Sequence, residues 1–215
     1  MSSVAVIDYG MGNLHSITKA LQHVAPNIDV RVTSNKNQIL QADRVVFPGV
    51  GAIRDCMNAL HQSGLDEVIL EAFQSGKPIL GVCLGMQALL TFSEENNGTK
   101  CLGLIPGEVI HFPQPLLAEN GKKLKIPHMG WNQVEQSFNH PLWNKIAPKS
   151  RFYFVHSYFA RPDDESVVAG TTDYPDTFCC ALARENIFAV QFHPEKSHVA
   201  GLQLLENFLQ WDGSF

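Results

Sequence analysis

Cys83 stands in a sequence context that suits nucleophilic chemistry, because glycines lie on both sides of it in Gly81-Val82-Cys83-Leu84-Gly85. The apolar run at residues 78–82 predicts a buried parallel strand, and the apolar spacing over residues 84–92 predicts a helix. This turn is the cysteine version of a nucleophile elbow, whose helix N-terminus stabilises a thiolate and a neighbouring oxyanion. The alternative is a buried, unreactive cysteine, because cysteine is common in protein cores.

His193 and Glu195 form a candidate acid–base pair within Phe192-His193-Pro194-Glu195. Proline favours extended backbone at the residue before it, and side chains two residues apart in an extended segment point the same way. A carboxylate beside an imidazole fixes its tautomer and stabilises its cationic form, as a cysteine nucleophile needs. There are two alternatives for this segment. In the first, Glu195 caps the final helix; in the second, His193 and His198 bind a metal. No Cys or carboxylate cluster completes a metal-ligand set, so we expect no metal.

The apolar segments predict how these groups are positioned. Strands are expected at residues 4–8, 29–33, 44–47 and 78–82, with helices at 14–24, around Met57 and Leu60, and at 65–73. Such alternation predicts an α/β fold, a doubly wound and mostly parallel sheet with helices on both faces. Sites in these sheets lie beyond the carboxyl ends of the strands. The Gly-rich turns at 10–13 and 48–51 are therefore expected to meet Cys83.

From about residue 103 the pattern changes to short apolar runs separated by turns such as Asn120-Gly121 and Glu185-Asn186. These runs predict antiparallel hairpins, some of which join the main sheet. They lie at residues 109–112, 124–126, 131–134, 152–156, 167–169, 178–182 and 187–192. A final helix is expected at about residues 199–211. Since there is neither a repeat nor a linker, we predict one domain over residues 1–215.

Composition excludes several classes of protein. The 215 residues are 45% hydrophobic and 17% charged, enough for a substantial core. A net charge of −5 argues against nucleic acid or an anionic membrane as the main partner. Five cysteines without a Cys-x-x-Cys pair fit a reducing cytoplasm better than a disulfide framework. We expect no signal peptide and no membrane span, because the start lacks a basic region and no apolar run approaches about 20 residues.

The segments 81–87 and 191–195 together resemble the motifs of the class I (triad) glutamine amidotransferases. They lie about 110 residues apart and in the order of that family, and the resemblance extends along essentially the whole chain. It implies that Cys83 attacks the side-chain amide carbon of glutamine, forms a glutamyl thioester and releases ammonia. It also implies that His193 is the general base and acid, and that Glu195 orients it.

The resemblance implies further roles around this triad. The backbone N–H of Leu84, which elbow geometry also favours, would form an oxyanion hole with one from the Val50-Gly51 turn. Residues expected to hold the substrate glutamine are Gln87, Glu95, His156, Ser157 and Tyr158. No cofactor is implied.

Four stretches, at residues 8–13, 48–51, 127–132 and 193–197, resemble one branch of this family. Its members form a heterodimer with a (β/α)8 cyclase of histidine biosynthesis and supply it with ammonia. Residues expected at this interface are Asn13, Trp131 and Lys196. The alternatives are a glutaminase of another pathway, such as pyridoxal phosphate synthesis, a non-catalytic scaffold of the same fold, and a cysteine peptidase.

Overall fold

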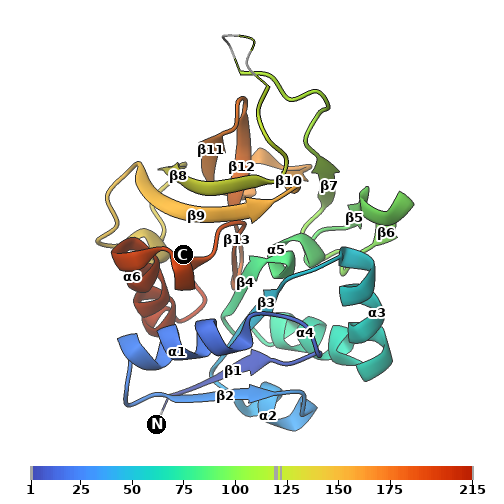
Figure 1. Cartoon of the computed structure of the whole chain (residues 1–215). Coiled ribbons are helices and arrows are strands. Elements are labelled where there is room, and N and C mark those ends of the chain that lie inside the picture. Colours follow the sequence, from blue (N-terminus) through green and yellow to red (C-terminus); the bar gives the residue numbers. More distant parts are fainter. Residues whose placement is uncertain (1, 119–120, 122, 215) are drawn as a thin grey trace.

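A single twisted sheet runs through the molecule, and helices pack against its lower half (Figure 1). The structure is a computed structural model that describes residues 2–118, 121 and 123–214. The described strands follow the order β2-β1-β3-β4-β13-β12-β10-β7-β5-β6, and β11, β8 and β9 extend the sheet from β12. None of the described helices is long and apolar enough to cross a membrane.

The N-terminal half has the predicted alternation of strands and helices. Its elements are β1 (Ser3–Ile7), α1 (Leu14–Val24), β2 (Asp29–Thr33), α2 (Lys36–Gln41), β3 (Arg44–Gly49), α3 (Ile53–Ser63), α4 (Leu65–Gln74) and β4 (Ile79–Cys83). Strands β2, β1, β3 and β4 pair in parallel, which confirms the doubly wound arrangement. The short helix α2 was not predicted. Its signal is Asn35, whose side chain accepts a hydrogen bond from the backbone N–H of Gln38 at the start of the helix.

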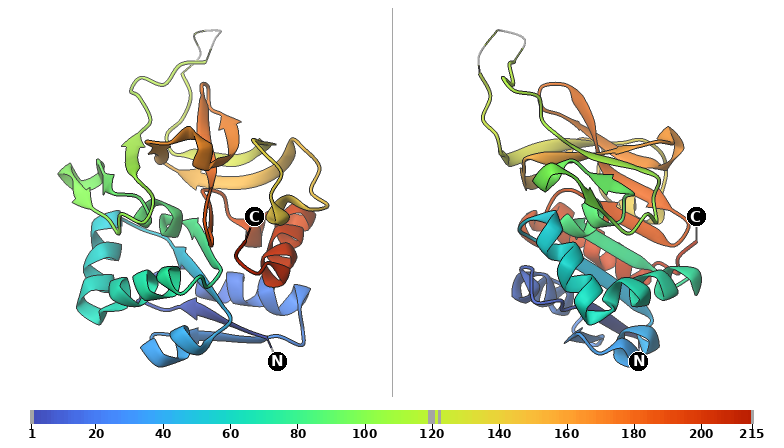
Figure 2. Two further views of the ribbon diagram at one scale, coloured as in Figure 1. Left: turned by 180° about the vertical axis from the view of Figure 1, so that it is seen from behind. Right: turned by 90° about the vertical axis from the view of Figure 1, so that its right-hand side faces the viewer.

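Alternate residues of each buried strand face opposite layers of helices. In β1, Val4 and Val6 share one apolar cluster with Leu21 of α1, and the same cluster includes residues of the last helix. Ala5 and Ile7 face the other cluster, which is formed with α3 and α4. The views in Figure 2 show helices on both sides of this part of the sheet, as expected for a parallel sheet buried on both faces.

The C-terminal half is mostly β-structure. Its elements are α5 (Leu84–Ala88), β5 (Phe92–Ser93), η1 (Glu95–Asn97), β6 (Thr99–Lys100), β7 (Gly107–His111), β8 (His128–Gln136), η2 (Pro141–Trp143), β9 (Ser150–His156), β10 (Tyr158–Pro162), η3 (Glu165–Val167), β11 (Val168–Asp173), β12 (Thr177–Arg184), β13 (Ile187–Val190), η4 (Pro194–Lys196) and α6 (His198–Gln210). The predicted turn at Glu185-Asn186 is present. Asn120 of the other predicted turn lies outside the described residues.

Two predicted elements of this half are wrong in type or length. The helix expected over residues 84–92 ends at Ala88, because the chain tightens there: the N–H groups of Leu89 and Leu90 bond to carbonyls only three residues back. Residues 124–126 are not a strand. Leu124 bonds to the carbonyl of Leu116, and the next apolar residue is followed by Pro127, which has no N–H to donate to a ladder.

Strand β13 departs from the predicted hairpin pattern. It pairs antiparallel with β12 but parallel with β4, in the middle of the sheet. All four of its residues are fully buried, which suits a central strand covered on both faces. This pairing carries residues 191–195 to the carboxyl end of β4, where Cys83 lies.

Candidate active site

Cys83 is the last residue of β4 and is followed immediately by α5. Its backbone has φ 54° and ψ −109°, a conformation that residues other than glycine rarely adopt and that marks a strained elbow. The turn is also crowded. A Cβ on Gly85 would lie 1.9 Å from the carbonyl oxygen of Phe47 in β3. The glycine after the cysteine is therefore needed for α5 to begin directly against the neighbouring strand.

His193 and Glu195 are joined by a hydrogen bond of 2.9 Å between Nδ1 and Oε1. Their side chains are only 3% and 2% exposed. The backbone around them is anchored, since the N–H of His193 donates to the carbonyl of Tyr153 on β9 and the hydroxyl of Ser197 donates to the carbonyl of His193. The imidazole is thus held with Nδ1 towards the carboxylate, and Nε2 remains for the thiol.

The structure rules out the alternative in which Glu195 caps the final helix. Helix α6 begins after Ser197, and the described side chains provide no capping hydrogen bond to it. Glu195 bonds to His193 instead. Within the described part of the chain, no three His, Cys, Asp or Glu side chains are grouped as metal ligands.

The electrostatics of the site favour a charged histidine. Burial lowers the pKa of His193, but the side chains of Cys83 and Glu195 raise it more, so that the pKa is about 10. A histidine with this pKa is an imidazolium at neutral pH. The geometry and this pKa support a Cys83–His193–Glu195 triad in which the histidine is an imidazolium.

A pocket of about 330 Å³ opens directly onto Cys83 and His193. Its lining contains Val50, Gly51, Cys83, Leu84, Gln87, Glu95, Pro127, Val155, His156, Ser157, Tyr158 and His193. The structure thus brings together every residue that the sequence assigned to the oxyanion hole and to the substrate, and adds Pro127 and Val155. A larger hollow, of about 740 Å³, lies at the far end of β1 and β2, and its lining holds no Cys, His or Glu.

Glu95 and Tyr158 lie at the same part of this pocket. Burial and the nearby carboxylates of Glu95 and Glu94 raise the pKa of Tyr158. Glu95 Oε2 also accepts a hydrogen bond of 2.9 Å from the backbone N–H of Ile53, the first residue of α3. Helix α3 follows directly on the Val50-Gly51 turn, so one carboxylate faces the pocket and anchors the segment after that turn.

The side chain of Gln87 is held inside the protein. Its Nε2 donates to the carbonyl of Tyr158 at 3.1 Å and to Oε1 of Gln191 at 2.9 Å. Gln191 was not predicted as a site residue, and its Nε2 donates to Cys83 Sγ at 3.6 Å. Its only signal in the sequence is its position two residues before His193.

His156 also makes internal contacts with both ring nitrogens. Nδ1 lies 2.8 Å from the carbonyl of Tyr158, and Nε2 lies 2.9 Å from Nδ1 of His128. Burial lowers the pKa of His156 to about 3 and that of His128 to about 4, so both rings are neutral at physiological pH. Any contact between the His156 segment and a ligand therefore comes from atoms other than these nitrogens.

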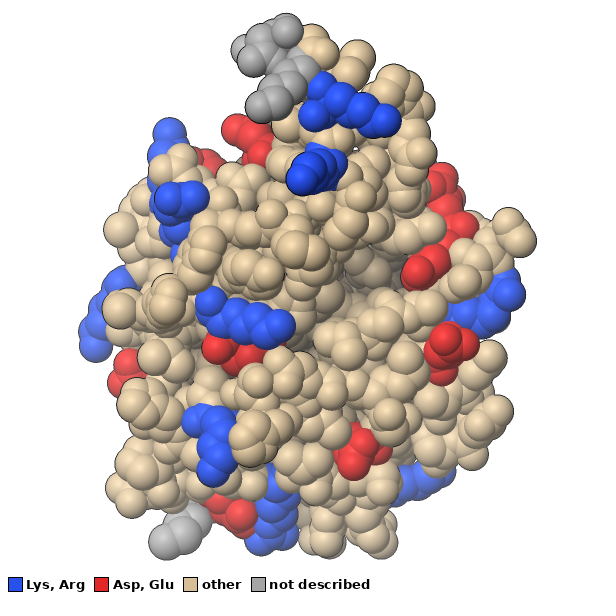
Figure 3. Space-filling model, viewed as in Figure 1, with Lys and Arg blue, Asp and Glu red and all other residues tan. Residues whose placement is uncertain are grey.

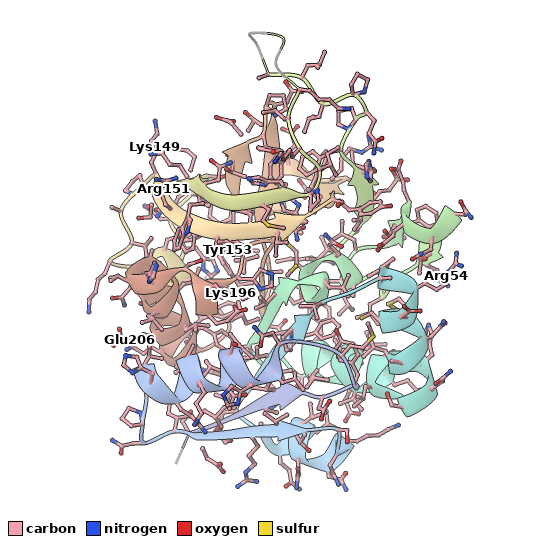
Figure 4. The ribbon with its side chains drawn as sticks, in the orientation of Figure 1. Arg54, Lys149, Arg151, Tyr153, Lys196 and Glu206 are labelled. Carbon is pink, nitrogen blue, oxygen red and sulfur yellow. The ribbon has the colours of Figure 1, made fainter. Side chains whose placement is uncertain are left out.

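The predicted interface residues do not line the pocket: two of them lie against aromatic rings, and the third lines a small cavity beside it. The Trp131 ring stacks on His198 with centroids 4.9 Å apart, and Lys196 Nζ lies 5.9 Å from the centre of the Tyr153 ring. Figure 4 shows Lys196 directly below Tyr153 of β9. Asn13 lines a very small cavity that Glu195 also lines.

The face shown in Figure 3 is hollowed at its centre, and acidic and basic side chains are scattered over it, with one of each close beside the hollow. Large apolar side chains exposed on β8, on the turn after β3 and on α6 are Met129, Trp131, Val50 and Val199.

Known proteins are similar to this chain over nearly its whole length. A family model described as "Glutamine amidotransferase class-I" matches residues 5–211. The "Imidazole glycerol phosphate synthase subunit HisH" of Methylococcus capsulatus is 62% identical over 213 residues, covering 99% of this chain and 98% of the relative. The protein of the same name from Nitrosococcus oceani is 60% identical over 213 residues, with 99% of both chains covered.

The fold is also found in solved structures. The chain is similar to PurLQS from Thermotoga maritima with a TM-score of 0.71 and 18% sequence identity, covering 97% of this chain and 98% of the other. A likeness at this identity concerns the fold alone.

Proposed function

We propose a function on the premise that this chain belongs to the class-I glutamine amidotransferase family. It is the glutaminase subunit of an imidazole glycerol phosphate synthase, and it hydrolyses L-glutamine to glutamate and ammonia for histidine biosynthesis. The near full-length identity of 62% and 60% to relatives named as that subunit supports this pathway over pyridoxal phosphate synthesis. The intact triad supports an enzyme over a scaffold of the same fold.

In the first half of the reaction, the Cys83 thiolate attacks the side-chain amide carbon of glutamine. The carbonyl oxygen becomes an oxyanion in the tetrahedral intermediate. The His193 imidazolium then gives its Nε2 proton to the leaving nitrogen, so that ammonia departs and a glutamyl thioester remains on Cys83. Glu195 keeps the proton on Nδ1 of the imidazole and thus fixes the tautomer that exchanges protons through Nε2.

In the second half, a water molecule attacks the thioester carbon and His193 takes its proton through Nε2. Collapse of the second tetrahedral intermediate breaks the C–S bond, releases glutamate and restores the thiolate–imidazolium pair. Both halves develop negative charge at the same oxygen. The backbone N–H of Leu84 and one from the Val50-Gly51 turn are the donors for it, since both segments line the pocket beside Cys83.

The remaining pocket residues orient the substrate. The Glu95 carboxylate suits the α-ammonium group of glutamine, and the Tyr158 and Ser157 segment suits its amino-acid end. Gln87 uses Nε2 for internal hydrogen bonds, so its Oε1 is the atom available to a ligand. Such orientation contributes to rate because it presents the amide carbon to Cys83 in one geometry.

The partner we propose is a (β/α)8 cyclase subunit, which makes imidazole glycerol phosphate and an aminoimidazole carboxamide ribotide. Ammonia must reach it unprotonated, because ammonium is not a nucleophile. A docked complex that covers the pocket mouth near Asn13, Trp131 and Lys196 delivers ammonia before it equilibrates with solvent. We place this complex in the cytoplasm. The five cysteines form no disulfide in the structure, and a reducing compartment keeps their thiols in that state.

The partner also controls the oxyanion hole in this proposal. Gly51 has φ 99°, in the left-handed region that glycine occupies at low cost, so the Val50-Gly51 peptide can turn over without strain. Docking of the cyclase with its nucleotide then favours the orientation that donates to the oxyanion. Such control requires that the partner bind this orientation better than the idle one.

The observation that carries the proposal is the pocket that joins Cys83, His193 and the Val50-Gly51 turn. The test is steady-state glutamine hydrolysis by this chain alone, with the cyclase, and with the cyclase plus its nucleotide substrate. We expect low, intermediate and high kcat in that order, with co-purification of the two subunits. Equal kcat in all three conditions would refute control by the partner, and no turnover in any of them would refute the glutaminase assignment.

A further inference from the structure

A continuous set of hydrogen bonds joins the carbonyl of Tyr158 to the sulfur of Cys83. Gln87 Nε2 donates to the Tyr158 carbonyl and to Gln191 Oε1, and Gln191 Nε2 donates to Cys83 Sγ at 3.6 Å. The two amide side chains are 5% and 0% exposed, so bulk water does not compete for these bonds. The triad chemistry described above uses neither amide as a donor to sulfur.

The direction of these hydrogen bonds is fixed by the backbone carbonyl at their origin. A carbonyl oxygen only accepts, so the end of the Gln87 amide that faces Tyr158 is its NH₂ group. The same nitrogen faces the Gln191 amide, which must therefore present Oε1 to it. The NH₂ end of Gln191 is then the end that faces Cys83. A flip of the Gln87 amide would place two acceptors against each other, and a flip of the Gln191 amide would place its NH₂ group against that of Gln87, two donors facing each other.

The Tyr158 carbonyl is held from a second side by the buried histidines. His156 Nδ1 lies 2.8 Å from it and must carry a proton, so its Nε2 accepts from Nδ1 of His128. His128 Nε2 then accepts from the side-chain amide of Asn132, which also donates to the carbonyl of Asp173. These hydrogen bonds, from Asn132 through His128 and His156 to the Tyr158 carbonyl, need only one proton on each ring, so both histidines are neutral. The Tyr158 carbonyl acts as an acceptor here too.

We propose that Gln191 is a further catalytic residue, whose side-chain N–H donates to the Cys83 sulfur and stabilises its thiolate, with Gln87 as the residue that positions it. The inference rests on the proposed function, because the thiolate is the nucleophile of that reaction. A hydrogen bond to an ionised acceptor is stronger than one to its neutral form, so the donor favours ionisation. It also directs one lone pair of sulfur and leaves another for the amide carbon.

The other ionisable groups near Cys83 do not depend on these amides. His193 faces the sulfur from the segment after β13, and Tyr9 from the turn after β1. Glu195 bonds to the far nitrogen of the His193 ring, and His193 in turn lowers the pKa of His156. A substitution of Gln191 or Gln87 by an apolar side chain of similar length removes the donor and adds or removes no charge.

The test measures the rate of Cys83 alkylation by iodoacetamide between pH 4 and 10, with the adduct assigned by peptide mass spectrometry. The full chain is used as wild type, Gln191→Met, Gln87→Met and Gln136→Met. Gln136 is the matched control, because its amide also donates to a backbone carbonyl, that of Ile146 at 2.9 Å, but away from the pocket. This readout needs neither glutamine nor the cyclase.

We expect Gln191→Met to move the midpoint of the pH profile upward by about one unit, as loss of a hydrogen bond to a charged group implies. Gln87→Met moves it upward by less, and Gln136→Met leaves it at the wild-type value. A wild-type midpoint in folded Gln191→Met overturns the proposal. If that variant melts early, Gln87→Met decides, because it removes the residue that positions Gln191 without adding a charge: its midpoint rises if the proposal holds, and an unchanged midpoint overturns it. Failure of the proposed function is seen separately, as absence of glutamine turnover by the wild-type complex.

Discussion

Glu195 Oε1 lies 2.9 Å from His193 Nδ1 in a contact that is almost completely closed to solvent. A buried carboxylate at this place does two things to the imidazole. It fixes which nitrogen carries the proton in the neutral ring, and it stabilises the cation that forms when the ring holds both protons. In the proposed reaction His193 contributes more than Glu195, because only His193 transfers protons to and from the reactants.

Glu195→Gln is therefore expected to be milder than His193→Ala. Glutamine keeps the size of the side chain and loses its charge, so kcat for glutamine hydrolysis should fall by roughly 10²–10³, against more than about 10⁴ for loss of the imidazole. The measurement is steady-state kcat of both variants in complex with the cyclase, with melting temperatures as the control for folding. A folded Glu195→Gln that is the slower of the two would show that the assigned roles are wrong.

Acid should destabilise the fold through its buried neutral histidines. His128 has a pKa of about 4 in the folded state, against about 6.5 for an unfolded chain. Because the folded pKa is depressed, the unfolded state takes up the proton first, and stability is lost as pH falls from about 6.5 towards 4. Each such histidine contributes up to about 1.4 kcal/mol per pH unit in this range.

The measurement is the free energy of unfolding in urea at several pH values for wild type and His128→Phe. The ring of this residue stacks on Tyr174 with centroids 4.0 Å apart, so phenylalanine keeps the aromatic contact. The variant should be less stable at pH 7 and should lose less stability on acidification than wild type. Parallel pH curves for the two proteins would contradict the assignment of a neutral, buried His128.

Gly85→Ala should damage the elbow although it adds a single methyl group. Its Cβ would lie 1.9 Å from the carbonyl oxygen of Phe47, so the helix or the strand must move. We expect a loss of about 1–3 kcal/mol in the free energy of unfolding and a lower rate of glutamine hydrolysis. Gly170→Ala is the milder comparison, because its Cβ would lie 3.3 Å from its nearest neighbours, a tight contact that a small shift relieves. Wild-type stability and activity in Gly85→Ala would refute the close approach.

The sequence predicted the local parts of the fold and of the site well. The predicted bounds of α1 and β2 rest on the spacing of apolar residues inside each element. The structure has the same bounds, Leu14–Val24 and Asp29–Thr33. The pairing of His193 with Glu195 was also accessible, because Pro194 fixes the geometry between them. These features depend on neighbours in the sequence.

Features that depend on distant parts of the chain were not accessible. The sequence of β13 predicts another hairpin strand. Its parallel pairing is with β4, more than 100 residues earlier, and no local pattern indicates that partner. Gln191 gives no sign of its role, since both amide contacts come from residues 104 and 108 positions away. The short run at 124–126 has the alternation of a strand but no neighbouring strand to pair with among the described residues.

Substitutions at the pocket mouth should act on the partner and leave the sulfur unchanged. Trp131→Ala is expected to weaken complex formation and stimulation of kcat by roughly tenfold or more, because Trp side chains at interfaces carry much of the binding energy. Lys196→Ala is expected to weaken both as well, because it removes a charge from the same face. Alkylation of Cys83 in the free chain should stay at the wild-type rate.

The matched controls are exposed residues away from this mouth, Leu70→Ala on α4 and Lys149→Ala, whose ammonium pairs with Glu135. Both should bind the cyclase like wild type. If Trp131→Ala and Lys196→Ala also bound and responded like wild type, the interface would lie elsewhere on the molecule.

The most direct test of the proposed chemistry is glutamate formation by the complex with cyclase and nucleotide, compared between wild type and Cys83→Ala. The loss of a nucleophile costs many powers of ten, so the variant should retain less than about 10⁻⁴ of the wild-type kcat while it still folds and binds the cyclase. A folded Cys83→Ala that kept more than a few per cent of the wild-type rate would contradict the thioester mechanism and the role of Cys83 in it.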